Sequence, residues 1–454
     1  MLSFIGLCLL LGIGHIVRLK VKLLRKLYLP SCVIGGLAGL ILLQGLYYSG
    51  ITLPPAWTAG WSKLPGFLIN IVFACLFLGV KLPKMKTLWS RAGIQLCYGQ
   101  VVAWGQYVVG VGLVLFLLGP VFNLPAVFGG ILPVGFEGGH GTAAGLGPTF
   151  DSIGWPEGKD FALASATAGI VSAILFGMVL INWAVRKGYT ARKIEADEIV
   201  EDDSIGVIPV DRRPSAGRLT ISSDAIESFS LHIVIVGMAL LIGLGLKQGL
   251  VLFEGYVPGL AEKKLLSSFP LFPLCMVGGL IIQVLEDRYD RHQLIDVGLT
   301  RRIQNSALDF LVVAAIATIS LKVIATGIIP LVILVCAGIA WNIFCVVYLA
   351  RRVFKNAWFE RAIAEMGQSM GVTATGLLLL RVVDPDYETP AADAFACKQL
   401  LHEPFMGGGL WTGMAIPLLA AIGGMPVFLI ATGMVVFWLV VIFVPRALRG
   451  RGSK

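Results

Sequence analysis

Two short stretches of the chain combine glycine with hydroxyl-bearing residues inside otherwise apolar sequence. Residues 125–150 read PAVFGGILPVGFEGGHGTAAGLGPTF, and residues 361–385 read RAIAEMGQSMGVTATGLLLLRVVDP. Glycine lets a ligand approach the backbone closely, and free N–H groups at helix ends bind anions. We therefore predict an anion-binding site here, with tight helix packing as the alternative. The predicted substrate contacts are Gly138, Gly139, His140, Gly141, Thr142, Ser369, Gly371, Thr373 and Thr375.

Arg381, in the second stretch, is the one basic residue that our predicted topology leaves inside the membrane. Ionisable residues at that depth usually have a function, and the planar guanidinium group fits a carboxylate. We therefore add Arg381 to the predicted substrate-binding residues. The alternative is a structural ion pair with Asp384 or Glu365.

Oxygen-bearing side chains in two apolar segments are suited to a hard cation. Asp309 follows Asn305 and Ser306 in the segment IQNSALDFLVVAAIATI, and Asn70 takes the equivalent place in the first half. Such oxygen ligands suit Na⁺ as they suit other hard cations. A helix cap or an interhelical hydrogen bond is the alternative role. The predicted Na⁺ ligands are Asn70, Glu137, Asn305, Ser306 and Asp309.

Titratable residues raise two further hypotheses. Glu137 and His140 flank the tip of the first glycine-rich stretch and could titrate, so coupling to protons stays open. His402 and Glu403 are residue types found in catalytic sites, but neither a nucleophile motif nor an H-E-x-x-H motif accompanies them. The eight cysteines form no C-x-x-C pair. We therefore expect neither an enzyme nor a cofactor, with Na⁺ acting only as a coupling ion.

The composition identifies the class of protein that must position these residues. Of 454 residues, 57% are hydrophobic and 14% are charged, whereas about 25% of the residues in a soluble domain are charged. This excludes a soluble globular protein, a disordered chain and a disulfide scaffold. It predicts an all-α polytopic membrane protein. We assign the net charge of +9 to loops on the cytoplasmic side of a bilayer, and expect no nucleic-acid partner.

Hydropathy predicts eleven spans, five in each half and one at the C-terminus. The polar segment 186–228 separates the halves as a linker. The two glycine-rich stretches are too polar to face lipid as continuous helices, and each is long enough for a re-entrant hairpin. The expected spans are 2–17, 28–46, 65–80, 94–118, 160–185, 229–247, 269–285, 305–321, 328–350, 391–422 and 425–445.

The distribution of basic residues predicts the orientation of the chain. With the linker in the cytoplasm and both stretches as hairpins, 29 of the 36 Lys and Arg residues are cytoplasmic and six are outside. Lys398 is one of those assigned to the cytoplasm, and Arg381 is the remaining residue. Cytoplasmic loops carry such an excess, so the N-terminus is predicted to lie outside.

The two halves resemble each other. PSCVIGGL at 30–37 matches PLCMVGGL at 273–280 at an offset of 243, and TAAGL at 142–146 matches TATGL at 373–377 at an offset of 231. Trp104 and Trp341 match at 237. We expect the glycines of PSCVIGGL and PLCMVGGL to serve helix packing. These glycines are Gly35, Gly36, Gly278 and Gly279.

Five spans in each half mean that the second copy enters the membrane from the opposite side. The predicted architecture is therefore two inverted five-helix repeats, each with a re-entrant hairpin. The first repeat covers 1–185, the second covers 229–422, and 423–454 form an extra C-terminal helix with a basic tail. This organisation is typical of secondary transporters. An anion channel with pore loops is the alternative from a different class.

GFEGGHGTAAGLGPTF at 135–150, with GQSMGVTATGLLLLRVVDP at 367–385 around a polar central loop, resembles the bacterial sodium/glutamate symporter family. The resemblance covers nearly the whole chain. It implies Na⁺-coupled uptake of L-glutamate by alternating access across the bacterial inner (cytoplasmic) membrane, a homodimer in the lipid bilayer, and elevator-like movement. It also implies that GGHG at 138–141 and GVTATG at 371–376 form the substrate and ion site. A Na⁺- or H⁺-coupled transporter of another carboxylate or amino acid is the alternative substrate assignment.

Overall fold

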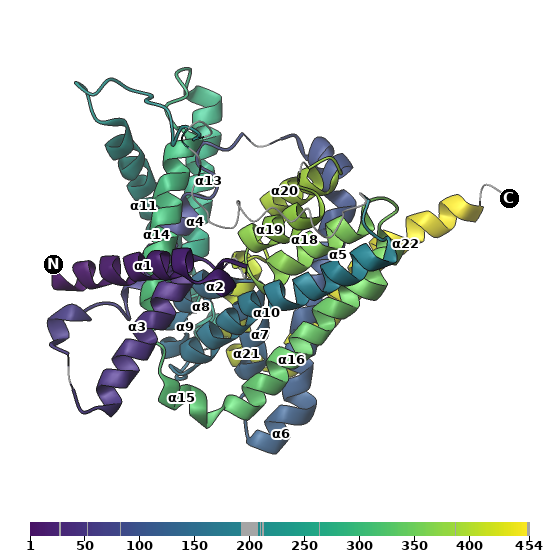
Figure 1. The fold of residues 1–454 in the computed structure, drawn as a ribbon, viewed down its shortest axis with the longest axis horizontal. Coiled ribbons are helices and arrows are strands. Elements are labelled where there is room, and N and C mark those ends of the chain that lie inside the picture. Colours follow the sequence, from purple (N-terminus) through teal and green to yellow (C-terminus); the bar gives the residue numbers. More distant parts are fainter. Residues whose placement is uncertain are drawn as a thin grey trace. The chain divides into compact units, whose positions relative to one another are not determined.

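In the computed structural model of the chain, every regular element among the described residues is a helix (Figure 1). The helices group into two compact units. Each unit draws segments from both halves of the chain, so the units do not coincide with the predicted sequential repeats. The structure describes residues 1–26, 29–51, 53–81, 83–191, 208, 210, 213–262, 264–385 and 387–451. Residues 192–207, 209, 211 and 212 of the predicted linker therefore lie outside the described residues.

Unit 1 consists of Met1–Leu82, Ala144–Pro156 and Glu201–Leu321. Its long helices come in two sets of three, one from each half of the chain. The first set is α1 (Leu2–Lys20), α3 (Ser31–Tyr48) and α4 (Leu64–Ala74), and the second is α11 (Ser228–Tyr256), α13 (Phe272–Tyr289) and α14 (Val297–Ala317). The short elements are α2 (Lys22–Lys26), η1 (Pro55–Trp57), α9 (Gly147–Ser152) and α12 (Pro258–Ala261).

The repeated glycine motif packs the helices of unit 1 together. A Cβ atom added to Gly35 would overlap the carbonyl oxygen of Leu10 on α1, and one added to Gly278 would overlap that of Ala239 on α11. Their neighbours Gly36 and Gly279 lie against α14 and α4 in the same way. Each motif thus contacts one helix of its own half and one of the other half. The packing role predicted for these glycines is confirmed.

Unit 2 consists of Pro83–Ala143, Glu157–Val200 and Lys322–Lys454. Its longest continuous elements are α5 (Met85–Leu113), α10 (Gly158–Lys187), α16 (Ile328–Phe344) and α22 (Gly424–Arg451). Shorter helices follow one another with breaks between them. They are η3 (Ala126–Gly130), α7 (Ile131–Phe136), α8 (Gly139–Gly145), α15 (Leu321–Thr326), α18 (Trp358–Met370), α19 (Thr373–Val383), α20 (Ala391–His402) and α21 (Leu410–Ile422). Both α8 and α15 cross the boundary between the units.

Two π-helical segments of unit 2 repeat at the spacing of the glycine-rich stretches. They are η2 (Val114–Leu118), which continues α5, and η6 (Cys345–Leu349), which continues α16. Each leads into one helical turn, α6 (Gly119–Phe122) or α17 (Ala350–Val353). Both pairs are 231 residues apart, and π-helices are rare, so their recurrence supports an internal repeat. Trp104 and Trp341 precede these segments by different distances, so the predicted offset of 237 is wrong for this helix pair.

Seven described helices are long and apolar enough to cross a membrane, against eleven predicted spans. They correspond to the spans predicted at 2–17, 28–46, 94–118, 160–185, 229–247, 328–350 and 425–445. The prediction of a span over 65–80 is wrong because α4 ends at Ala74. Residues 269–285 and 305–321 fall largely within α13 and α14, each of which carries at least three charged residues. The predicted span 391–422 is also wrong, because residues 403–409 separate α20 from α21.

Candidate functional site

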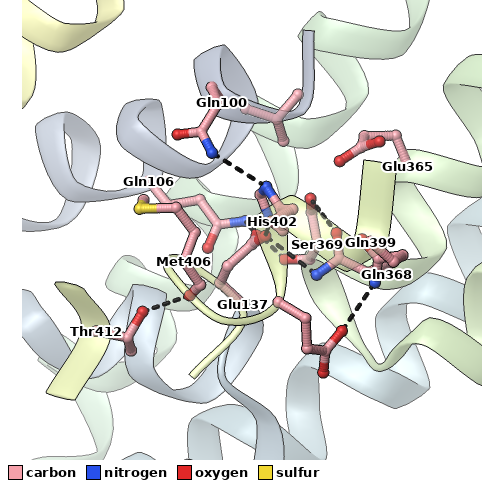
Figure 2. Close-up of polar contacts among 12 residues, drawn as sticks. Gln100, Gln106, Glu137, Glu365, Gln368, Ser369, Gln399, His402, Met406 and Thr412 are labelled. Carbon is pink, nitrogen blue, oxygen red and sulfur yellow. Dashed lines mark hydrogen bonds and ion pairs between the residues drawn. The ribbon is translucent and has the colours of Figure 1, made fainter. Parts of the chain in front are cut away.

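Three helix breaks meet inside unit 2. A Cβ atom added to Gly139, at the start of α8, would lie 3.4 Å from Cγ1 of Val372, which joins α18 to α19. His402, the last residue of α20, lies 2.5 Å from Glu137, which follows α7. Figure 2 draws the polar side chains gathered here. The breaks cover residues 137–138, 371–372 and 403–409.

Glu137 lies at the centre of this cluster and is 4% exposed. Its Oε1 atom is 2.5 Å from Nε2 of His402 and accepts a hydrogen bond of 3.1 Å from Nε2 of Gln368. Gln106 on α5 donates to the other carboxylate oxygen at 3.5 Å and to the carbonyl oxygen of Ser369 at 2.6 Å. One carboxylate therefore joins four segments of the chain: the first break, α5, α18 and α20.

The tautomer of His402 follows from its two neighbours. The Gln100 amide nitrogen lies 3.5 Å from Nδ1 of His402, and Trp104 fixes the Gln100 oxygen with a hydrogen bond of 3.0 Å. Nδ1 then accepts from Gln100, which leaves the ring proton on Nε2, where it is donated to Glu137. The arrangement accommodates a neutral imidazole against a carboxylate.

A buried ion pair borders the Glu137 cluster. Nζ of Lys398 on α20 lies 2.5 Å from Oε1 of Glu365 on α18 and donates to Oε1 of Gln368 at 3.0 Å. Both charged side chains are fully buried. Gln95 on α5 donates to the second carboxylate oxygen of Glu365 at 2.9 Å. The pair ties α18 to α20 and links to Glu137 through the shared Gln368.

A second carboxylate faces the break between α18 and α19. Glu403 accepts hydrogen bonds of 2.9 Å from the Thr373 hydroxyl group and from the Gln399 amide. Both donors are neutral, and this half-buried carboxylate forms no ion pair within 4.0 Å among the described residues. The cluster holds three carboxylates against one ammonium group, and such an excess of negative charge attracts cations.

A family model described as sodium/glutamate symporter matches residues 1–388 of this chain. The chain belongs to the sodium/glutamate symporter family. Its activity is therefore the Na⁺-coupled symport of glutamate, and it is a multi-pass membrane transporter rather than an enzyme. No protein with a curated description matched the chain. The matched residues include the first two breaks and end before α20.

Most of the substrate residues predicted for this symporter lie at the first two breaks. Thr142 and Ser369 are buried, and the Thr142 hydroxyl has no hydrogen-bond partner in the described part of the chain. His140 is directed to α10, where its Nε2 atom lies 2.9 Å from the Thr167 hydroxyl. The predicted residues at these breaks are Gly138, Gly139, His140, Gly141, Thr142, Ser369, Gly371, Thr373 and Thr375.

Arg381 lies away from the symporter's helix breaks. It is exposed in the last turn of α19, eight residues after Thr373, which is about 12 Å along a helix axis. The charge count assigned Lys398 to the cytoplasmic side, and the structure shows that its side chain is buried in unit 2 against Glu365. Lys398 is therefore a basic group that contacts the cluster.

The predicted Na⁺ ligands of the symporter fall in different units. Glu137 belongs to unit 2, whereas Asn70, Asn305, Ser306 and Asp309 belong to unit 1. Asn70 donates to the carbonyl oxygen of Gly66 at 2.9 Å, and the other three unit 1 residues are exposed. Among the described residues, no group of three or more His, Cys, Asp or Glu side chains is arranged to hold a metal ion.

Sequence reasoning missed Glu365, Gln368 and Lys398 as members of the site. Two signals were present. Glu365 and Gln368 are three residues apart and therefore share a helix face. Pro404 and the glycines at 407–409 interrupt the apolar pattern after α20, which indicates a break rather than a continuous span.

Proposed function

We propose that the three helix breaks of unit 2 form the site at which this symporter binds L-glutamate and Na⁺. The observation that supports the proposal is the contact of the breaks around Glu137 and Glu403. Transporters place their binding sites where discontinuous helices meet, because free backbone groups at helix ends can then hold substrate and ions. The cluster also provides polar side chains of both donor and acceptor character.

The substrate carboxylates bind at the start of α19 in this proposal. This helix begins at Thr373 with no side chain capping its N-terminus. Its first N–H groups and the positive end of its dipole favour an anion. The hydroxyl groups of Thr373 and Ser369 add donors. Arg381 remains a predicted contact, which requires α19 to present its last turn to the ligand.

Glu403 binds the substrate ammonium group. Its hydrogen-bond partners, Thr373 and Gln399, are neutral, so its charge is available for a cationic ligand. Thr373 would then lie between the two ends of glutamate, with its hydroxyl on Glu403 and its backbone N–H at the helix terminus. This arrangement selects an amino acid over a simple dicarboxylate, because the latter lacks a cationic group.

Na⁺ binds beside Glu137. The buried oxygens of Gln106 and Thr142 have no hydrogen-bond partner among the described residues, and Gln106 already contacts Glu137 through its nitrogen. Neutral and anionic oxygens of this kind suit a hard cation. Coupling follows if Na⁺ stabilises the geometry of the breaks that glutamate requires. The Na⁺ ligands predicted in unit 1, Asn70, Asn305, Ser306 and Asp309, stay predictions.

Unit 2 moves relative to unit 1 in an elevator-like manner. The division of the chain supports this proposal, because all three breaks belong to unit 2 while unit 1 consists of two sets of packed helices. The π-segments and glycine motifs support inverted repeats with re-entrant hairpins. We further propose the topology indicated by the basic residues, a homodimer, and inward transport across a bacterial inner membrane.

The Glu403→Gln variant tests the site. Removing one partner of a largely desolvated charge pair costs about 2–5 kcal/mol, or at least about 30-fold in affinity. Glutamate affinity in proteoliposomes should fall by that factor, while Na⁺ still stabilises the protein against heat. Asp393→Asn is the matched control, because Asp393 lies on α20 with its side chain 58% exposed. Unchanged glutamate affinity in Glu403→Gln would exclude this carboxylate from the site.

Counterflow separates the remaining alternatives. A symporter exchanges labelled glutamate faster when unlabelled glutamate is present on the opposite side, whereas a channel shows no such stimulation. Uptake should require Na⁺ at constant pH, and competition by aspartate and citrate should define the substrate class. Uptake driven by a pH gradient without Na⁺ would instead support proton coupling.

A further inference from the structure

A pocket of about 580 Å³ that plays no part in the site above lies at the end of α10. It lies entirely within unit 2, where α10 ends and α17 follows η6. Its lining contains aromatic and basic side chains and no acidic one. The lining residues are Trp183, Tyr189, Val347, Tyr348, Arg351 and Arg352. We call it the aromatic–arginine pocket.

Arg351 is stacked among three aromatic rings of this pocket. Its guanidinium carbon lies 4.2 Å from the ring centre of Tyr189, 4.9 Å from that of Trp358 and 5.1 Å from that of Trp183. Rings cover the flat faces of a guanidinium group and leave the N–H groups at its edge. Arg351 forms no ion pair with a carboxylate in the described part of the chain. Its edge is therefore available to an anion.

The pocket lies where two membrane-spanning helices end. The candidate spans Gly158–Lys187 and Ile328–Val353 both finish beside it. Trp and Tyr side chains are typical of the boundary between hydrocarbon and water. Exposed apolar side chains continue from the pocket along the same two helices, with Val179 62% and Phe344 48% exposed. An anion with apolar chains attached fits both surfaces at once.

We propose that the aromatic–arginine pocket binds the head group of an anionic phospholipid such as phosphatidylglycerol. The phosphate oxygens accept hydrogen bonds from the edge of Arg351, and Arg352 adds positive charge. The acyl chains run along Val179 and Phe344. Basic pockets between membrane helices bind acidic head groups in this way. The bound lipid would hold the end of α10 against α17, directly before α18 and the second helix break.

Native mass spectrometry of the full-length protein in detergent tests the proposal. Titration with palmitoyl-oleoyl phosphatidylglycerol should show one tightly retained lipid, and Arg351→Gln should weaken its binding at least about tenfold. Arg352→Gln, a second variant at the pocket, should weaken it less. Arg288→Gln is the matched control, because Arg288 stacks on the single ring of Tyr289 in unit 1. It should bind the lipid as the unmodified protein does.

Three outcomes would overturn the assignment. One is equal retention of phosphatidylglycerol by Arg351→Gln and by the unmodified protein. Another is equal binding of phosphatidylcholine, which would show that head-group charge is not recognised. The third is displacement of the lipid by millimolar inorganic phosphate, which would identify a site for free phosphate. Thermal unfolding in zwitterionic detergent gives a further check, because a purely structural Arg351 would lower stability equally with and without phosphatidylglycerol.

Discussion

Helix α10 and the pair α20–α21 occupy corresponding places in the two halves of the chain, but only one of them is continuous. Residues 158–187 form a single helix, whereas the segment 231 residues later is broken over residues 403–409. At this spacing, Lys398 corresponds to Thr167, and Glu403 corresponds to Ser172. The continuous copy carries neutral residues at the positions where the broken copy carries charges. In the repeat that we propose, the two halves share the same helical frame, and the charged residues of the proposed site lie where the symmetry is broken.

Lys398→Met should have the largest effect on stability. It leaves Glu365 charged and buried without its partner, which costs about 3–5 kcal/mol. Thr167→Val, at the corresponding place on α10, removes a neutral hydrogen bond worth about 1 kcal/mol. Denaturant titration in detergent measures both. The double variant Lys398→Met/Glu365→Gln should regain much of the loss. Equal losses of stability in Lys398→Met and Thr167→Val would contradict the proposed contrast between the two helices.

Gly409→Ala should have the next largest effect. A Cβ atom at this position would overlap the carbonyl oxygen of Pro404, within the break itself. Overpacking of this kind costs about 1–3 kcal/mol, and the distorted break should also slow glutamate uptake. Gly433→Ala on α22 is the control, because nothing lies within 4 Å of its added Cβ atom. Normal uptake by Gly409→Ala would show that the break tolerates repacking.

Asp393→Asn should have the smallest effect, although it lies on the same helix as Lys398. Its carboxylate lies 3.5 Å from Arg91, and both side chains are more than half exposed. Exposed ion pairs contribute about 0–1 kcal/mol, so the free energy of unfolding should change by less than about 1 kcal/mol. A larger loss would mean that α20 depends on its surface contacts as well as on its buried pair.

The continuous helices could be predicted from the sequence, whereas most of the site could not. Long apolar runs identify α5, α10 and α22, because no turn signal in the local sequence outweighs the helical pattern. The break after α20 was missed because its apolar residues outweighed Pro404 and the glycines that follow it. The Lys398–Glu365 pair joins residues that are 33 positions apart. Such a contact depends on tertiary packing, which no local pattern records.

Each glycine-rich stretch contains one of the helix breaks, at residues 137–138 in the first stretch and 371–372 in the second. The match of Thr142 with Thr373 would place a break at residues 140–141, opposite 371–372. The structure has it at 137–138, three residues earlier. Glycine marks where a helix can end, and several glycines in succession leave the choice to packing.

The hydrogen bond between Glu137 and Gln368 joins residues that are themselves 231 positions apart. In the proposed repeat these two positions are equivalent, so exact symmetry would place identical side chains opposite each other. Two glutamates would bring like charges together, and two glutamines would carry no charge at all. One substitution on one side gives a donor, an acceptor and a single negative charge. At this contact the two halves therefore differ in charge, which gives the pair a direction that an exact repeat would lack.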